Sequence, residues 1–333
     1  MAIILIATLF LFSRASADIK DFLDSCKPAD VHRYISDHLQ PDESYRNECS
    51  SVVDHLARFF KTGSDFTVNR FIKGGSLGKG TALKSKSDVD VVMFISELPA
   101  IRSFNYSDKL RMQLDALEST LQRPWQSIRN AAIGIGFRVA VVGRTNYAVK
   151  LRVQSLKPDH KPHDVDLLLT SDLLGPTPSN SKIKDVYEMM ATMNFYGYAR
   201  ENCSAALVAF VKKQPAEVKD LIRLVKMWKS SCVREPSLTS YPLELLCIHT
   251  WPSCGTVAGA FKAVLEKLSD HKRICAYWTD NYPFDRMLTM LRRHPLILDP
   301  ANPYNNVADR CRDWDAVARA ARETLQKPFF RYV

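Results

Sequence analysis

Two aspartates that flank a single valine constrain this chain more than any other feature of its sequence. Asp88-Val89-Asp90 leads into a run of β-branched and aromatic residues, which predicts a buried strand over residues 89–95. Side chains two positions apart on a strand project from the same face, so both carboxylates would point the same way. An Asp-x-Asp pair alone is also typical of a solvated turn, but unpaired charge entering a buried strand is costly and favours cation binding.

A third aspartate repeats this arrangement later in the chain. Asp166 precedes three leucines, and the apolar segment that it begins is predicted to form another strand. A neighbouring strand in the same sheet would bring Asp166 beside Asp88 and Asp90. Such carboxylates suit two Mg²⁺ ions about 4 Å apart, which stabilise the attacking and leaving oxygens in phosphoryl chemistry. We interpret Asp164 as an exposed residue at the strand start and Asp172 as a loop or cap residue.

A Gly-Gly-Ser turn lies just upstream of these aspartates. Gly74-Gly75-Ser76 follows a predicted strand over residues 66–73. At such a strand end, glycines let backbone N–H groups approach an anion, and the serine hydroxyl adds a donor. Lys79 follows closely, and residues 79–83 are expected to form a short helix or turn. Flexible turns often have this composition, so the motif gains its meaning from its place ahead of the Asp-x-Asp strand.

The remaining hydrophobic periodicity divides the chain into an α/β part and a helical part. Apolar spacing predicts helices over residues 28–39, 43–60 and 107–121, a hairpin of strands 137–142 and 147–153, and a strand over 164–169. From about Ser181 onward, helices are predicted over residues 182–193, 205–213, 216–231, 241–249, 257–268, 285–293 and 314–325. Turn-forming residues at 175–180 favour a boundary there, which gives an α/β domain over residues 18–175 and a helical domain over 176–333.

Charge and cysteine content narrow the function classes further. The net charge of +10 favours polyanionic partners such as nucleotides or nucleic acid. Net charge indicates which ligands are attracted to the protein, but not which reaction it catalyses. The eight cysteines include no C-x-x-C pair and no Cys/His spacing of the zinc type, so a zinc site is not expected. Several lie in apolar segments, and we interpret them as free thiols.

The N-terminal residues 1–17 allow two interpretations. An apolar run ends in Ala15-Ser16-Ala17, a small-x-small pattern that is typical of a signal-peptidase site. However, no Lys or Arg precedes the run, so an apolar extension of the domain stays equally open. The run is much shorter than the roughly 20 residues that a membrane-spanning helix needs, so stable membrane insertion is not expected.

The motifs together resemble one family of enzymes. Gly74-Gly75-Ser76-Leu77-Gly78-Lys79-Gly80-Thr81 with Ser87-Asp88-Val89-Asp90-Val91-Val92 is similar to the nucleotidyltransferase signature of the 2′-5′-oligoadenylate synthases. Further matches are Val165-Asp166, Asp172-Leu173-Leu174-Gly175, Leu221-Ile222-Arg223-Leu224-Val225-Lys226-Met227-Trp228, Leu243-Glu244-Leu245-Leu246, Tyr277-Trp278-Thr279 and Ile297-Leu298-Asp299-Pro300-Ala301-Asn302-Pro303. The resemblance runs in one order from about Pro28 to the end of the chain.

This resemblance implies an α+β fold, in which a polymerase-β-like nucleotidyltransferase lobe and a C-terminal α-helical lobe enclose the active site. It implies template-independent synthesis of 2′-5′-linked oligoadenylates, with ATP as donor and acceptor and with release of pyrophosphate. The aspartates at 88, 90 and 166 would bind two Mg²⁺ ions, and Asp166 would lie near the attacking 2′-hydroxyl. Ser76 would contact the donor phosphates, Arg223 and Lys226 would reach the donor ATP, and Tyr241 would stack near its base.

The resemblance also implies activation by double-stranded RNA. It further implies a cytoplasmic location and a role in antiviral innate immunity. Such RNA binding uses contacts to phosphate and 2′-hydroxyl groups. The cations at matching positions are Lys61, Arg70, Lys73, Lys79 and Lys212. The chain departs from the family pattern at Val208, Ala216, Glu217 and Ser240.

Other functions share these motifs. A cyclic dinucleotide synthase has the same Gly-Ser and three-carboxylate core, so product identity separates it from an oligoadenylate synthase. A catalytically inactive RNA-binding relative would be expected to have lost a carboxylate, and all three are present. A secreted location is the alternative to the cytoplasm if residues 1–17 are cleaved.

Overall fold

The computed structural model describes residues 18–84, 89–100, 103–122, 137–156, 162–175, 177, 179–192 and 204–333. The chain divides into two compact units. A sheet unit contains Pro41–Lys213 and Pro300–Asn305, and a helical unit contains the residues up to Gln40 together with Gln214–Asp299 and Asn306–Val333. Asp88, the segment 1–17 and the boundary prolines 176 and 178 lie outside the described residues.

The division of the chain differs from the predicted boundary at 175–180. Helices α8 (Asn180–Thr192) and α10 (Ser204–Lys212) follow that segment but belong to the sheet unit. The physical reason is packing, because α10 contacts the short helix α5 (Gly75–Lys79), and Val186 of α8 clusters with Leu173 and Leu174. A density of turn formers therefore marks a loop here and not a change of compact unit.

The sheet unit is built on five strands in the order β1-β2-β5-β4-β3. The strands are β1 (Val68–Lys73), β2 (Val89–Ile95), β3 (Phe137–Arg144), β4 (Ala148–Ser155) and β5 (His163–Thr170). β2 and β5 pair in parallel, and the other neighbours pair antiparallel. The predicted strands and the predicted β3–β4 hairpin are confirmed, with ends that shift by a few residues.

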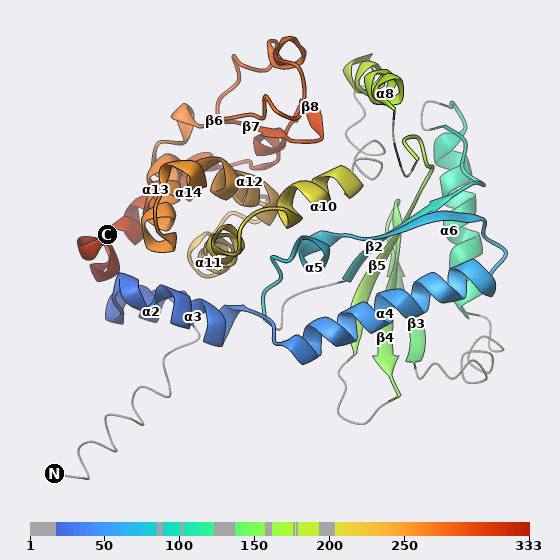
Figure 1. The fold of residues 1–333 in the computed structure, drawn as a ribbon, viewed down its shortest axis with the longest axis horizontal. Coiled ribbons are helices and arrows are strands. Elements are labelled where there is room, and N and C mark those ends of the chain that lie inside the picture. The colour runs from blue at the N-terminus through green and yellow to red at the C-terminus, as the bar shows by residue number, and fades with distance from the viewer. Residues whose placement is uncertain are drawn as a thin grey trace. The chain divides into compact units, whose positions relative to one another are not determined.

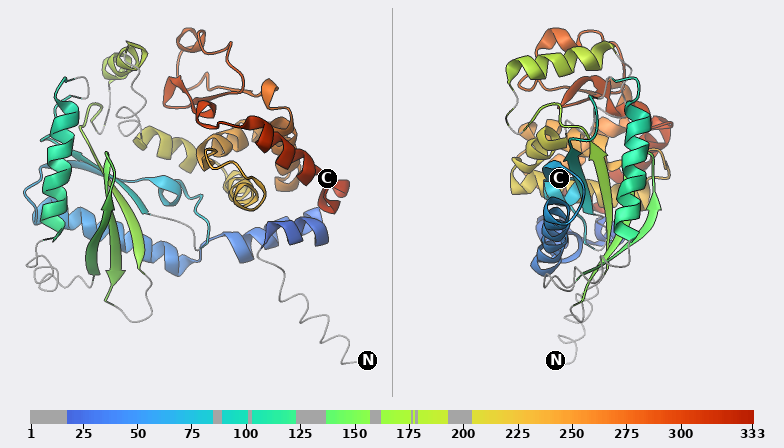
Figure 2. Two further views of the ribbon diagram at one scale, coloured as in Figure 1. Left: turned by 180° about the vertical axis from the view of Figure 1, so that it is seen from behind. Right: turned by 90° about the vertical axis from the view of Figure 1, so that its right-hand side faces the viewer.

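One face of this sheet is covered by two helices, α4 (Glu43–Thr62) and α6 (Tyr106–Gln122) (Figure 1). Their apolar residues pack against the odd-numbered residues of β2, β4 and β5 in one core cluster. Asp42 caps α4 by accepting a hydrogen bond from the backbone N–H of Tyr45 at 2.8 Å. The further views in Figure 2 also show α6 running along the sheet.

The even-numbered residues of the same strands project from the opposite face. On β4 every second residue from Lys150 to Gln154 is exposed, and β5 exposes Asp164 and half-exposes Asp166. β2 is buried at every position except Asp90, which is half-buried. Strand alternation therefore places the charged residues of three neighbouring strands on one face.

The helical unit consists mainly of α11 (Ala216–Cys232), α12 (Ser240–Thr250), α13 (Val257–Ser269) and α14 (Trp314–Leu325). Trp228 at its centre is fully buried, and its indole N–H donates to Thr324 Oγ1 at 2.8 Å. The other elements are α2 (Ile19–Ser25), η1 (Pro28–Asp30), α3 (Val31–Tyr34), η2 (Ile35–Leu39), η3 (Trp251–Ser253), η4 (His271–Arg273), β6 (Cys275–Ala276), η5 (Phe284–Met287), β7 (Leu296–Asp299), η6 (Val307–Arg310) and η7 (Pro328–Tyr332). β8 (Asn302–Asn306) spans the boundary between the two units.

Two predictions for this unit need correction. The predicted helix over residues 28–39 is a succession of 3₁₀, α and π turns. The predicted helix over residues 285–293 is wrong, since only the 3₁₀ turn η5 forms there. Met287 and Met290 are buried at a spacing of three, which satisfies a 3₁₀ turn as well as an α-helix and made the pattern ambiguous. The paired strands β6 and β7 were not predicted.

Seven cysteines fall within the described residues, and all are free, as predicted. Cys203 lies outside the described residues. Within the described part of the chain, no helix combines the length and apolar character that a membrane span requires.

His55 in the core of the sheet unit makes stability depend on pH. Its ring is 1% exposed and packs on Phe137 with ring centroids 5.0 Å apart. Burial lowers its pKa to about 4, with Arg58 adding to the effect. The folded state thus resists protonation, so we expect up to about 3 kcal/mol of the free energy of unfolding to be lost as pH falls from 6.5 towards 4. Urea titrations at several pH values should show that His55→Leu loses less free energy of unfolding over this pH range than wild type. An equal loss in both proteins would contradict the role of His55 in this pH dependence.

Candidate active site

Asp90 and Asp166 come together at the centre of the sheet. They are register partners on β2 and β5, which are parallel neighbours, and both are half-buried on the face opposite α4 and α6. Paired residues of neighbouring strands project from the same face, so the two carboxylates share one surface. This confirms the prediction that a neighbouring strand brings Asp166 beside the Asp-x-Asp strand. Asp88 lies outside the described residues.

The Gly-Gly-Ser motif is tied directly to Asp90. The backbone N–H of Gly74 donates to the backbone oxygen of Asp90 at 2.7 Å. Gly75 has a φ of +55°, and a Cβ on this residue would overlap the Asp90 carboxylate. Only glycine combines this backbone conformation with so close an approach.

The local structure around this motif differs from the expected one. Helix α5 (Gly75–Lys79) contains Gly75 and Ser76 and ends at Gly80, whose φ is +76°. The predicted helix or turn over residues 79–83 is therefore placed too late. A left-handed residue just after a helix is a common way to end it, and the glycine at 80 marks that end.

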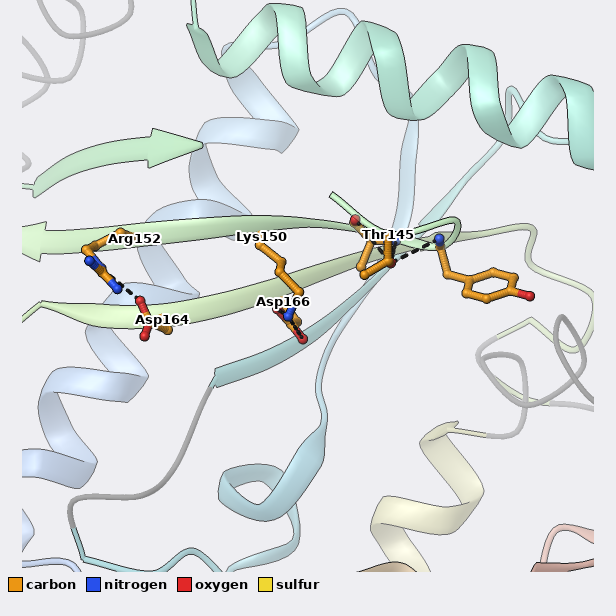
Figure 3. Close-up of polar contacts among 7 residues, drawn as sticks. Thr145, Lys150, Arg152, Asp164 and Asp166 are labelled. Carbon is orange, nitrogen blue, oxygen red and sulfur yellow. Dashed lines mark hydrogen bonds and ion pairs between the residues drawn. The ribbon is translucent and has the colours of Figure 1, made fainter. Parts of the chain in front are cut away.

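Two ion pairs run along the exposed face beside the aspartates (Figure 3). Lys150 Nζ lies 3.3 Å from Asp166 Oδ1, and Arg152 Nε lies 2.9 Å from Asp164 Oδ1. Both pairs join register partners on β4 and β5. Lys150 was not predicted from the sequence. The signal was present, because cations at every second position of one strand match aspartates at every second position of the next.

The donor chemistry of the site fits a hard divalent cation. Asp90 and Asp166 supply carboxylate oxygens, the ligands that Mg²⁺ prefers, and the glycine at 75 leaves room for the Asp90 carboxylate where a side chain would otherwise lie. The described residues contain no group of three His, Cys, Asp or Glu side chains that would hold a metal by themselves. Asp88 is not among the described residues.

Arg223 and Lys226, the predicted ATP ligands, already have acidic partners within the helical unit. Both lie on α11 and are 8% exposed. Lys226 Nζ lies 2.5 Å from Glu244 Oε1 on α12, and Arg223 Nη1 lies 2.8 Å from Asp220 Oδ1. Burial raises the pKa of Asp220, and Arg223 opposes that effect. Tyr241 is half-buried in the first turn of α12.

The predicted RNA-binding cations occupy different environments. Lys61 and Lys212 are exposed. Lys73 is half-buried and donates to Ser50 Oγ at 2.9 Å, and burial lowers its pKa. Lys79 is buried.

Arg70 is held by contacts within the sheet unit. Its Nε and Nη2 donate to the two carboxylate oxygens of Asp172 at 2.9 and 2.5 Å, and its guanidinium lies 4.2 Å from the Phe94 ring centroid. Asp172 also accepts from the backbone N–H of Gly175, which agrees with its predicted loop or cap role. These contacts and the burial of Lys79 favour structural roles for both cations and weigh against their contact with RNA.

Sequence comparisons relate the chain to known enzymes. Residues 183–333 match the family described as 2′-5′-oligoadenylate synthetase 1, domain 2, C-terminus. The 2′-5′-oligoadenylate synthase 2 of Rattus norvegicus is 30% identical over 90% of this chain and 44% of its own length. The 2′-5′-oligoadenylate synthase 1A of the same species is 29% identical over 90% of each chain. The chain is thus similar to 2′-5′-oligoadenylate synthases over about 90% of its length.

The oligoadenylate synthases to which the chain is similar differ in length. The chain spans about half the length of the synthase 2 of rat, but nearly all of the synthase 1A. Among solved structures, that of Escherichia coli MS115-1 CdnC with ATP has a TM-score of 0.60 and 23% identity over 89% of each chain. This likeness shows the fold, and it confirms the expected α+β, polymerase-β-like fold.

Proposed function

We propose that this chain joins ATP molecules through 2′-5′ linkages and releases pyrophosphate. The observation that carries the proposal is the register pairing of Asp90 with Asp166 beside a glycine that admits the Asp90 carboxylate. Similarity to the oligoadenylate synthases supports the 2′-5′ linkage, since the geometry of the carboxylates by itself supports only nucleotidyl transfer to a hydroxyl.

Asp88, Asp90 and Asp166 would hold the Mg²⁺ ions, and we propose two. When bound, Mg²⁺ supplies positive charge to the oxygens that become negative during transfer. The chain's own residues do the positioning. Gly74 fixes the Asp90 backbone, Gly75 lets the carboxylate approach, and β5 presents Asp166 near the place where an attacking hydroxyl would lie. Ser76, which is half-buried on α5, would contact the donor phosphates.

We further propose that Arg223, Lys226 and Tyr241 bind the donor ATP. The two cations are pre-oriented by Asp220 and Glu244, so little side-chain entropy would be lost when phosphate approaches. The cost is that each carboxylate partner competes with the nucleotide for the same positive charge. Replacement of either cation by an uncharged residue should therefore lower the stability of the protein and raise its KM for ATP.

For double-stranded RNA we propose a surface that includes Lys61 and Lys212, the two exposed cations among the candidates. Contacts from such lysines to phosphate would make activation weaken steeply as salt concentration rises. An RNA-activated synthase of innate immunity would act in the cytoplasm, which is the location that we propose.

The test is to incubate the protein with ATP and Mg²⁺, with and without long double-stranded RNA, and to determine the linkage in the products. We expect 2′-5′-linked oligomers whose yield rises when RNA is present. Products with only 3′-5′ linkages, or cyclic dinucleotides, would contradict the proposed linkage and favour the cyclic dinucleotide synthases that share this fold. Full activity without RNA would contradict activation by RNA.

A further inference from the structure

The ammonium group of Lys150 lies against the carboxylate of Asp166. Its Nζ lies 3.3 Å from Oδ1 and 3.4 Å from Oδ2, so it faces both oxygens of the carboxylate almost equally (Figure 3). A divalent cation bound by both oxygens of a carboxylate approaches it from this same side. The ammonium and a divalent cation would therefore compete for one position.

The strand register builds this contact. Asp166 on β5 is the partner of Asp90 on one side and of Lys150 on the other. On the other side of β4, Lys150 is the register partner of Gly143 on β3, where the β3–β4 register shifts between Val141 and Gly143. A Cβ on Gly143 would lie 3.7 Å from Lys150 Cδ, so the glycine removes one side-chain contact that would otherwise form with the aliphatic stem of the lysine.

The contact is also weak enough to be broken. The Lys150 and Asp166 side chains are 46% and 32% exposed, and exposed ion pairs are worth little because water and salt screen them. The four-carbon stem can swing the ammonium out into solvent at small cost. A divalent cation with several carboxylate ligands would bind far more strongly than one ammonium group.

We propose that Lys150 is a displaceable counter-ion of the metal site. It holds the Asp166 carboxylate in place while no divalent cation is bound, and it moves aside when one binds. Lys150 is thus a positioning residue that weakens divalent binding and sets the concentration at which the site fills. This inference rests on the proposed role of Asp90 and Asp166 as cation ligands.

The expected effect is measurable. The displaced ammonium stays tethered to β4 within several ångströms of the bound dication, and at that distance it still repels the dication, even in a water-like dielectric, enough to change a dissociation constant by about tenfold. Lys150→Met should therefore bind divalent cations about tenfold more tightly than wild type. A purely structural role for the lysine predicts the opposite sign, because loss of an ordering contact would leave Asp166 less well placed.

The chain supplies a matched control in Arg152. It lies two residues further along the same exposed face of β4 and pairs with Asp164 in the same way. Arg152→Met removes the same charge from the same strand but not from Asp166. Lys150→Arg keeps the charge at the site and should stay close to wild type.

The experiment uses Mn²⁺ as the probe and follows its binding to the nucleotide-free protein by the electron paramagnetic resonance signal of the free ion. We expect tighter binding for Lys150→Met, less than a threefold change for Arg152→Met, and loss of binding for Asp90→Asn. Equal affinities for Lys150→Met and Arg152→Met, or weaker binding for Lys150→Met, would overturn the role of Lys150 while leaving the metal site intact. Unchanged binding in Asp90→Asn would instead overturn the metal assignment in the proposed function.

Discussion

Gly75→Ala should lose at least about 100-fold in the rate of pyrophosphate release from ATP. The added methyl group would overlap the Asp90 carboxylate, which must then move away from its place beside Asp166. Misplacement of a reacting or ligand group by about 1 Å is sufficient for a loss of this size. The variant should also lose about 1–2 kcal/mol of stability, because alanine is strained at a φ of +55°.

Gly175→Ala is the matched control for that prediction. Gly175 has a φ of +71°, and among the described residues no atom would lie within 4 Å of an added Cβ. This variant therefore carries the conformational strain without the overlap, and it should lose stability but keep its turnover. Turnover near wild type in Gly75→Ala, or an equal loss in both variants, would show that the fit between Gly75 and Asp90 does not matter for the reaction.

Lys226→Met should destabilise the protein by about 3–5 kcal/mol. Lys226 and Glu244 are 8% and 4% exposed as side chains, so the substitution leaves a buried carboxylate without its cation. Removal of one member of a buried pair costs far more than replacement of both. Urea denaturation of the single variant, followed through tryptophan fluorescence, to which the buried Trp228 on the same helix contributes, measures this loss.

The double variant Lys226→Met with Glu244→Leu separates stability from ATP binding. It should recover most of the lost stability, because two apolar side chains of similar size replace the pair. If Lys226 also binds the donor ATP, the double variant should still show a raised KM. A single variant within 1 kcal/mol of wild type would contradict the account of the ion pair, and a double variant with a normal KM would contradict ATP binding by Lys226.

The strands of the sheet unit could be predicted because the pattern of apolar and polar residues along each strand depends on which of its faces are buried. β2 forms over the predicted residues, since its β-branched and aromatic side chains are buried on both faces except at Asp90. Asp90 is the one charged residue in this apolar strand, and that contrast marked it as a candidate site residue in the sequence. The side of the sheet that carries Asp166 followed from simple alternation along β5.

The contacts between elements could not be predicted in the same way. The overlap between Gly75 and Asp90, and the pairs of Lys150 with Asp166 and of Lys226 with Glu244, depend on register and on helix packing. A shift of one residue would send each strand side chain to the other face. Arg70 shows the same limit, because its structural role depends on Asp172, more than 100 residues away.

The most direct test of the central claim compares Asp166→Asn with Asp164→Asn in a pyrophosphate-release assay with ATP and Mg²⁺. The two residues lie two positions apart on the same face of β5, and each pairs with a cation on β4. We predict that Asp164→Asn turns over at a rate close to wild type, whereas Asp166→Asn loses about 1000-fold or more because a ligand for the metal is gone. Comparable rates for the two variants would contradict the assignment of Asp166, with Asp90, to the centre of nucleotidyl transfer.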